Sequence, residues 1–199
     1  MSLTTEGQTA TESPPVPGRR IAIRGATGSG KTTLGRRLGE TLGLPFIELD
    51  ALFWNPNWVE TPPDEFKAKV AAAIDGCPDG WVCDGNYRGR LGNLILARAD
   101  TLIWLHLPWR VSFWRLLKRT ASRAWTREPM WAGNTESWRK AFLSKDSILW
   151  WSITHRSGSN YALPPGETPV SIRVYELRSA REVQSFIDDS TQGVRPSTG

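Results

Sequence analysis

The sequence predicts an α/β protein whose parallel sheet is covered by helices on both faces. Short apolar segments alternate along the chain with longer segments in which apolar residues recur every three or four positions. These patterns are typical of buried strands and of amphipathic helices, respectively. Strands that alternate with helices in this way pair in parallel, because each crossover returns the chain in the same direction. A length of 199 residues is enough for one such domain.

A glycine-rich segment follows the first expected strand, which spans about 19–25. It matches G-x-x-x-x-G-K-[ST], the phosphate-binding P-loop. A helix with leucine at every fourth position follows at 31–42. This order directs backbone N–H groups and the positive end of a helix dipole at an anion, so we expect a nucleoside triphosphate site rather than an ordinary turn. The residues expected to bind it are Gly25, Ala26, Thr27, Gly28, Ser29, Gly30, Lys31, Thr32 and Thr33.

The same patterns place the other elements. Further strands are expected at 45–50, 81–85, 101–107 and 170–177, and further helices at 61–75, 88–99, 108–124, 136–143, 147–156 and 179–188. Thr61 is expected to cap the second helix, with Pro62 at its first position. Ser179 and Glu182 have the spacing of a capping box at the start of the last helix.

Ligands of such sheets bind where the strands end, and Gly25, Asp50 and Asp84 each end an expected strand. Lys31 is expected to reach the β- and γ-phosphates as a catalytic group. A P-loop also needs oxygen ligands for Mg²⁺, and Thr32 with Asp84 fits best. Asp50 is the other carboxylate candidate. The alternative for each aspartate is a cap on the helix or turn that follows it.

Three arginines of the long helix at 108–124 are spaced four residues apart, so they form one stripe: Arg115, Arg119 and Arg123. Guanidinium groups are permanently charged, fork-shaped donors that match phosphate oxygens. We expect Arg115 and Arg119 to bind the nucleotide, and Arg119 and Arg123 to stabilise the transferring phosphoryl group. The alternative is a solvated helix face.

The segment 84–88 reads Asp-Gly-Asn-Tyr-Arg and follows the third expected strand. Together with the P-loop and the arginine stripe, it resembles the adenylate kinase-like family of nucleoside and small-molecule kinases. In that family a D-G-[FY]-P-R segment ends the third strand, and its arginine holds a substrate phosphate. Asp84, Gly85 and Arg88 match this segment, whereas Asn86 and Tyr87 stand in place of the aromatic residue and the proline.

The resemblance implies a P-loop NTPase fold: a three-layer sandwich with five parallel strands in the order 2-3-1-4-5 and a helical lid that begins near the arginine stripe. The closer likeness is to small bacterial proteins labelled topology modulation or adenylate kinase-related, through segments 49–54, 56–58, 81–87 and 115–119. That likeness implies no settled substrate. We expect a single domain over 19–190 with a lid at about 119–157, preceded by a disordered leader at 1–18 and followed by a flexible tail at 191–199.

Aromatic residues surround Asp50 in the predicted arrangement: Phe53, Trp54, Trp58 and Tyr87. Such rings stack on a flat ligand or exclude water, and Asp50 is placed to orient or deprotonate an acceptor hydroxyl. The alternative is ordinary core or loop packing. The residues expected to bind the acceptor are Asp50, Trp54, Asp84 and Arg88.

The chain carries a net charge of +5, and ten of its 25 basic residues lie between 109 and 156, interleaved with tryptophans. We therefore keep two hypotheses. The first is a phosphotransferase that uses ATP and Mg²⁺ to phosphorylate a nucleotide or another small molecule. The second is a nucleotide-dependent nucleic-acid-binding or regulatory protein, because stacking and phosphate contacts hold single strands. No Asn-Lys-x-Asp signature of GTPases is present, which favours ATP over GTP.

The remaining observations concern the cell compartment. Cys77 and Cys83 match no metal or redox spacing and are expected to be buried, reduced thiols. No apolar run is long enough to span a membrane, and the first residues lack the features of a signal peptide. We expect a cytoplasmic protein without a membrane partner.

His106 is expected to be a satisfied core or rim residue, and His155 a helix-end residue or a phosphate contact.

Overall fold

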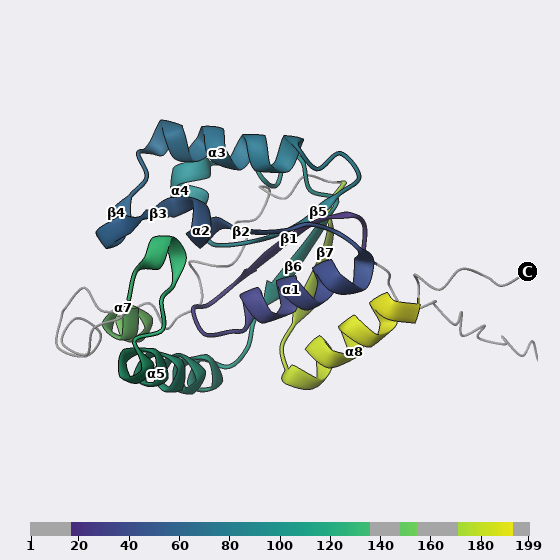
Figure 1. The fold of residues 1–199 in the computed structure, drawn as a ribbon. Coiled ribbons are helices and arrows are strands. Elements are labelled where there is room, and N and C mark those ends of the chain that lie inside the picture. Colours follow the sequence, from purple (N-terminus) through teal and green to yellow (C-terminus); the bar gives the residue numbers. More distant parts are fainter. Residues whose placement is uncertain (1–16, 136–147, 155–170, 193–199) are drawn as a thin grey trace, which may run out of the picture.

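The computed structural model describes residues 17–135, 148–154 and 171–192. Within them, five strands form one parallel sheet in the order β2-β5-β1-β6-β7 (Figure 1). The strands are β1 (Arg20–Gly25), β2 (Phe46–Glu48), β5 (Trp81–Asp84), β6 (Thr101–Leu105) and β7 (Arg173–Leu177). Counted along the chain, these five strands follow the predicted order 2-3-1-4-5. The labels run higher because a separate antiparallel pair, β3 (Trp54–Asn55) and β4 (Val59–Glu60), was not predicted.

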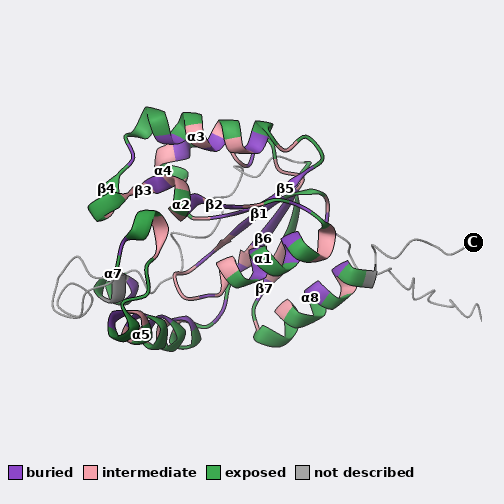
Figure 2. Cartoon of the chain, viewed as in Figure 1, coloured by how far each residue is buried: buried purple, intermediate pink, exposed green. Residues whose placement is uncertain are grey.

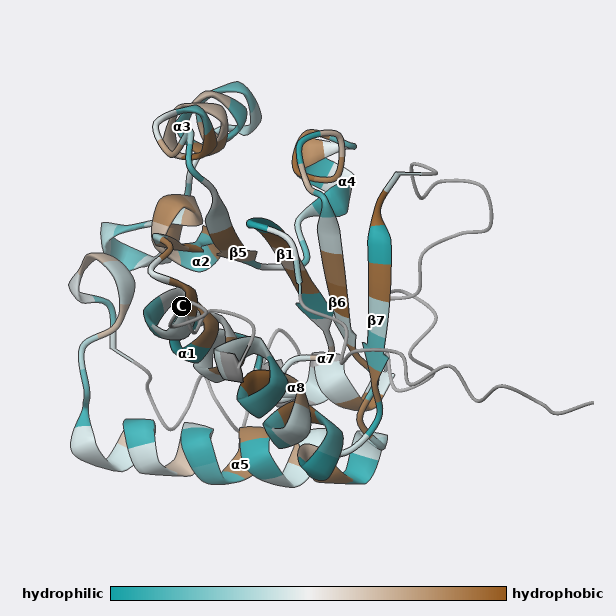
Figure 3. Cartoon of the chain, turned by 90° about the vertical axis from the view of Figure 1, so that its right-hand side faces the viewer, coloured by the Kyte–Doolittle hydropathy of each residue, from teal (hydrophilic) through white to brown (hydrophobic). Residues whose placement is uncertain are grey.

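Helices cover both faces of this sheet, as predicted (Figures 1 and 3). One face carries α1 (Lys31–Leu42) and α8 (Ala180–Gln192), and the other carries α3 (Pro63–Asp75) and α4 (Arg88–Leu91). The helix α5 (Trp109–Thr126) follows β6 and runs beside the P-loop, with α7 (Ile148–Thr154) against it. The short helices α2 (Leu49–Phe53), η1 (Pro56–Trp58) and η2 (Trp131–Gly133) complete the described elements.

The core lies on both sides of the sheet, where Figure 2 shows continuous burial along the central strands. On one side, Ala22 of β1 belongs to a cluster with Phe66 and Val70 of α3. On the other side, Ile23 belongs to a cluster with Leu34 of α1 and Phe186 of α8. Neighbours on one strand therefore face opposite layers, and β1 is apolar at consecutive positions because both layers are filled.

Two predicted helix ends are found where the sequence placed them. Gly43 ends α1 in the left-handed region with φ 62°, and its N–H donates to the carbonyl of Gly39. At the start of α8, the N–H of Glu182 donates to Ser179 Oγ over 3.1 Å, and that hydroxyl donates to Glu182 Oε1 over 2.8 Å. Gly43 thus fixes the end of α1, and Ser179 with Glu182 fixes the start of α8. These two helices cover the same face of the sheet.

Several boundaries differ from the prediction. The strand predicted at 45–50 ends at Glu48, so Asp50 lies in the first turn of α2. Thr61 does not cap α3, which begins at Pro63, because its hydroxyl donates to the carbonyl of Leu52 over 3.1 Å. The helix predicted at 88–99 stops at Leu91, where Gly92 takes φ 57°. The preference of threonine for helix caps cannot show that the hydroxyl of Thr61 is already hydrogen-bonded to Leu52.

Other predictions fall wholly or partly outside the described residues. These are the helix at 136–143, His155, most of the leader at 1–18, much of the lid at 119–157 and most of the tail at 191–199. Gly18 is described, and its N–H donates to Thr101 Oγ1 over 2.8 Å. In the described part of the chain, none of the helices has the length and apolarity needed to cross a membrane.

Candidate functional site

The P-loop connects β1 to α1 and lies directly against α5. Gly28 takes φ 82°, and a Cβ there would lie 2.3 Å from the carbonyl oxygen of Ser112 in α5. Gly30 takes φ 98° as the residue before α1. Gly28 and Gly30 thus adopt backbone conformations that other residues rarely take. The missing side chain at Gly28 also allows α5, which carries the arginine stripe, to approach the loop closely.

Lys31 lies over the loop, where its Nζ donates to the carbonyls of Gly25 and Ala26 over 2.9 and 3.0 Å. Burial is the main cause that lowers its pKa, and the charge of Arg119 acts in the same direction. The carboxylates of Asp84 and Asp50 act in the opposite direction and raise the same pKa. A concave loop that carries a partly desolvated ammonium suits an anion.

Thr32 and Asp84 meet beneath the loop. Thr32 Oγ1 donates to Asp84 Oδ2 over 2.6 Å, and Asp84 is only 4% exposed. Burial is the main cause that raises the pKa of Asp84, against the lowering effects of Lys31 and Thr32. Its other oxygen, Oδ1, is buried and has no hydrogen-bond partner among the residues that the structure describes. Buried polar atoms are normally paired, so this oxygen calls for a partner that the described part of the chain does not supply.

A hydroxyl beside a carboxylate with a spare oxygen fits Mg²⁺, which takes few protein ligands and fills its shell with water and phosphate oxygens. In the described ranges, no group of three or more His, Cys, Asp or Glu side chains forms a metal cage.

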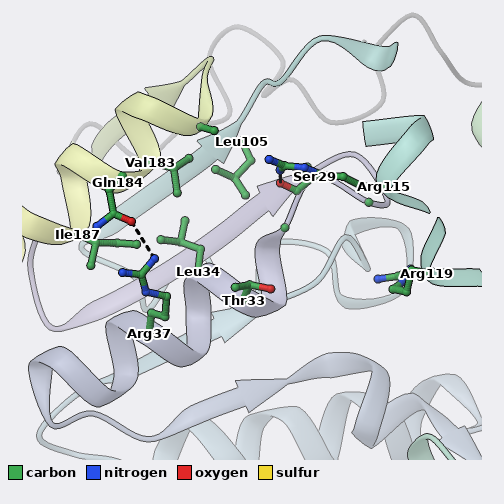
Figure 4. Close-up of a pocket in the computed structure, with 13 residues that line it drawn as sticks. Ser29, Thr33, Leu34, Arg37, Leu105, Arg115, Arg119, Val183, Gln184 and Ile187 are labelled. Carbon is green, nitrogen blue, oxygen red and sulfur yellow. Dashed lines mark hydrogen bonds between the residues drawn. The ribbon is translucent and has the colours of Figure 1, made fainter. Parts of the chain in front are cut away.

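The arginine stripe reaches the loop through two of its three members. Every fourth residue of α5 is buried against the fold: Ser112, Leu116, Thr120 and Ala124. Arg115 and Arg119 lie beside this buried face and line the cleft next to the P-loop (Figure 4). Arg115 Nη1 donates to the carbonyl of Ser29 over 3.4 Å. Arg123 does not line the cleft, and its catalytic role stays a prediction.

The cleft has a volume of about 360 Å³ and lies between the P-loop, α5 and α8 (Figure 4). Its loop side comprises Gly28, Ser29, Gly30, Thr33, Arg115 and Arg119. Its other wall, which sequence reasoning missed, comprises Leu34, Arg37, Leu105, Ala180, Val183, Gln184 and Ile187. Arg37 Nη1 donates to Gln184 Oε1 over 3.0 Å at that end. A cationic side and a largely apolar wall match the phosphates and the nucleoside of a nucleotide.

The second half of the site lies on the opposite face of the sheet. Tyr87 Oη donates to Asp50 Oδ1 over 2.6 Å, and burial followed by the charge of Asp50 raises the pKa of Tyr87. The rings of Phe53 and Tyr87 lie 4.7 Å apart, and both contact Phe66 at 5.1 Å. Phe53 is therefore core, which is the alternative that the sequence left open. Trp54 is half-buried, with its ring edge against Phe53 at 4.8 Å.

Asn86, which marked a departure from the family segment, joins the two halves. Its Nδ2 donates to the carbonyl of Gly25 over 2.6 Å, and its Oδ1 accepts from the N–H of Gly25 over 3.4 Å. The turn after β5 is thereby tied to the first residue of the P-loop. Arg88 begins α4 two residues later, on the same side of the sheet as Asp50. Nothing in the sequence indicated that the side-chain amide of Asn86 would bond the turn after β5 to the P-loop.

His106 lies at the rim rather than in the core. The strand β6 ends at Leu105, so His106 is exposed, with its ring stacked on Trp104 at 4.4 Å. Its Nδ1 lies 2.6 Å from Glu176 Oε1. The two cysteines are free thiols, as predicted, but only Cys83 is buried and Cys77 is half-buried. Burial raises the pKa of Cys83 far above its usual range.

The sheet order and the P-loop after β1 define a P-loop NTPase fold. A model of the shikimate kinase family matches residues 27–69, from within the P-loop to the middle of α3. No curated protein matches the chain.

Three solved structures share the fold. A gluconokinase from Sinorhizobium meliloti 1021 has a TM-score of 0.53 at 20% identity, with 90% of this chain and 93% of that chain covered. A putative kinase from Chloroflexus aurantiacus j-10-fl has a TM-score of 0.50 at 17% identity, covering 92% and 100%. A shikimate kinase from Acinetobacter baumannii, in complex with shikimate, has a TM-score of 0.50 at 16% identity, covering 91% and 94%. The narrower resemblance to adenylate kinase-like proteins stays a prediction.

Proposed function

We propose that this protein is an ATP-dependent kinase that phosphorylates a hydroxyl group of a small molecule. The observation that carries the proposal is the Thr32–Asp84 pair beneath the P-loop, with the orphaned Oδ1 of Asp84. Mg²⁺ held there would neutralise charge on the phosphates during transfer. The names of the matched family and of two structural neighbours, shikimate kinase and gluconokinase, support a small hydroxylated acceptor.

The donor half binds and orients the triphosphate. The P-loop N–H groups and Lys31 hold the phosphates, and Arg115 and Arg119 approach the same space from α5. Fixed cations aimed at the transferring group stabilise the charge that spreads over its oxygens. The cleft beside α8 receives the nucleoside.

The acceptor half supplies the proton acceptor. Asp50 is fixed by the hydrogen bond from Tyr87 to Oδ1, and its Oδ2 makes no hydrogen bond within the described residues. In the proposed step the acceptor oxygen loses its proton to Asp50 and forms a bond to the γ-phosphorus. The bond between that phosphorus and the bridging oxygen breaks, and ADP leaves. A carboxylate beside the acceptor is the usual base for this reaction.

The test is a phosphoryl-transfer screen with labelled ATP and Mg²⁺ against nucleosides, nucleotides, sugars, sugar acids and other hydroxy acids. We expect transfer to one acceptor class, with losses of at least about a hundredfold for Lys31→Ala, Asp84→Asn and Asp50→Asn. Lys118→Ala, on the exposed side of α5, is the matched control and should transfer normally. Absence of transfer to every acceptor, or full activity of Lys31→Ala, would contradict the proposal.

One observation favours the second hypothesis, a nucleic-acid-binding protein. Trp114 and Trp125 are 59% and 81% exposed on α5, next to the exposed cations Arg110 and Lys118. Exposed rings between cations suit stacking on single-stranded bases. Titration of tryptophan fluorescence with oligothymidylate at low and physiological salt tests it. Binding that weakens with salt and with Trp125→Ala would support this function, and no binding at low salt would exclude it.

A further inference from the structure

The side chain of Asn86 pairs with the backbone of the first P-loop residue as a neighbouring strand would. Its Nδ2 donates to the carbonyl of Gly25 over 2.6 Å, and its Oδ1 accepts from the N–H of Gly25 over 3.4 Å. The register of β1 with β5 ends at the pair of Ile23 with Asp84. A side-chain amide carries the same donor and acceptor as a peptide group. Asn86 therefore extends the pairing of these strands beyond the end of β5 and holds the peptide groups on both sides of Gly25.

The carbonyl that Asn86 holds also orients Lys31. Lys31 Nζ donates to the carbonyls of Gly25 and Ala26 over 2.9 and 3.0 Å, and these are its only hydrogen bonds to residues that the structure describes. An ammonium group has three N–H donors, and a carbonyl oxygen has two lone pairs. Gly25 can thus accept from Lys31 and Asn86 together, and one donor of Lys31 stays available to a phosphate.

Each carbonyl that holds Lys31 has a second donor of its own. The carbonyl of Ala26 accepts from the N–H of Ser29 over 3.1 Å, a bond within the P-loop. The carbonyl of Gly25 relies on Asn86, which belongs to the turn after β5. Gly25 is buried with a φ of 154°, and glycine has no side chain that would hold its peptide groups in place. The direction of this carbonyl therefore depends on Asn86.

We propose that Asn86 is a positioning residue for Lys31, which acts through the carbonyl of Gly25 and directs the remaining N–H of Lys31 at the β- and γ-phosphates of the nucleotide. The proposal rests on the nucleotide site of the proposed function, and on neither its acceptor half nor phosphoryl transfer. Small errors in the placement of such a group are costly, because the phosphates are held in one geometry. The competing explanation is that Asn86 orders the whole loop and acts on its N–H groups without Lys31.

A double-mutant cycle in nucleotide binding separates these two explanations. A fluorescent, non-hydrolysable ATP analogue is titrated with Mg²⁺ present into the wild type, Asn86→Leu, Lys31→Ala and the variant that combines both changes. Leucine is close to asparagine in size and has no polar side-chain atoms, so it releases the carbonyl of Gly25. The control is Asn93→Leu, which changes an exposed asparagine whose side chain makes no hydrogen bond to the described residues.

We expect Asn86→Leu to bind the analogue about tenfold more weakly than the wild type, and Asn93→Leu to bind it equally well. In the Lys31→Ala protein, the same change at Asn86 should weaken binding by less than about twofold, because no ammonium is left to orient. AMP lacks the phosphates that Lys31 reaches, so it should displace the analogue with the same affinity from the wild type and from Asn86→Leu. This second comparison leaves Lys31 in place.

Three results would overturn the proposal. Unchanged binding of the analogue to Asn86→Leu would show that the amide has no role in binding. An equal loss with and without Lys31, or a loss for AMP as large as for the analogue, would show that Asn86 orders the loop as a whole. Asn86→Ala gives the same comparisons if leucine disturbs the turn. Coupling between Asn86 and Lys31 in a protein that transfers no phosphate would overturn the kinase function and leave the role of Asn86 standing.

Discussion

Thr32 Oγ1 donates a 2.6 Å hydrogen bond to Asp84 Oδ2, and this contact joins the first turn of α1 to the end of β5. The hydroxyl is the only hydrogen-bond partner of the Asp84 carboxylate among the described residues, because Oδ1 has none. The pair is thus both a structural contact and the place where a cation would be held.

Replacement of Thr32 tests this relationship with one variant that keeps the size of the side chain and one that keeps its hydroxyl. Thr32→Val removes the hydroxyl and leaves both oxygens of Asp84 buried and unpaired, so we expect a loss of about 1–3 kcal/mol in the free energy of unfolding. Thr32→Ser keeps the hydroxyl and should lose less than half of that. Chemical denaturation with and without Mg²⁺-ATP measures both effects. Equal stability of the two variants would show that the hydrogen bond contributes nothing.

The arginine stripe provides a second test, because the structure divides its members. Arg119 lines the cleft and influences Lys31, whereas Arg123 does neither. We expect Arg119→Ala to lower kcat by about 10²–10³, as for loss of one donor to a developing charge, and Arg123→Ala to lower it by less than tenfold. Steady-state kinetics on the acceptor identified by the screen compares them. A larger loss for Arg123→Ala would show that the arginine approaches the phosphates only in the loaded enzyme.

Much of this arrangement could be predicted from the sequence, since the P-loop and the alternation of elements are local patterns. Asp84 and Thr32 were predicted together because each belongs to a motif with a fixed place on the fold. No motif indicated that Gln184 would line the cleft, because its position depends on how α8 packs against the rest of the fold. The strands β3 and β4 are two residues each, too short for any periodicity to appear.

Gly28 is predicted to tolerate no side chain. A Cβ there would lie 2.3 Å from a backbone oxygen of α5, at a φ of 82° that L residues rarely adopt. We expect Gly28→Ala to cost about 1–3 kcal/mol and to weaken ATP binding, because α5 and its arginines must shift. Gly89→Ala is the control, since a Cβ there meets nothing within 4 Å. Unfolding curves and ATP titrations of both variants decide the matter, and an unaffected Gly28→Ala would refute this account of the loop.

The cluster of Glu176 with Arg178 and His106 predicts a pH dependence of stability. Hydrogen bonds from Arg178 and then His106 lower the pKa of Glu176 to about 2 from its ordinary 4.5. A carboxylate with a lowered pKa stabilises the fold above its unfolded pKa, and this contribution disappears as the pH falls from 4.5 towards 2. Glu176→Gln should therefore be slightly less stable than wild type at pH 7 and equal to it near pH 2. Denaturation at several pH values measures this difference, and a difference that grows at low pH would contradict it.

Asn134 joins the segment after α5 to the hairpin beside the acceptor site. Its Oδ1 accepts from the N–H of Trp58 over 2.9 Å, and its Nδ2 donates to the carbonyls of Asn55 and Trp131 over 2.9 and 2.8 Å. Three of the four non-glycine residues with positive φ in the described ranges lie in these two segments: Asn57, Trp58 and Ala132. Such conformations persist only where surrounding contacts enforce them.

We therefore expect Asn134→Ala to release this contact, because the change leaves three partly buried backbone groups without this partner, at a cost of about 1–3 kcal/mol. Hydrogen exchange should accelerate in 54–60 and 130–135, while the strands of the main sheet keep their protection. Asn93→Ala, at a position outside both segments, is the control. If the hydrogen bonds of Asn134 hold the β3–β4 hairpin in place beside the proposed acceptor site, Asn134→Ala should also raise the KM for the acceptor more than the KM for ATP. Unchanged exchange in both segments would show that the hairpin holds its conformation without Asn134.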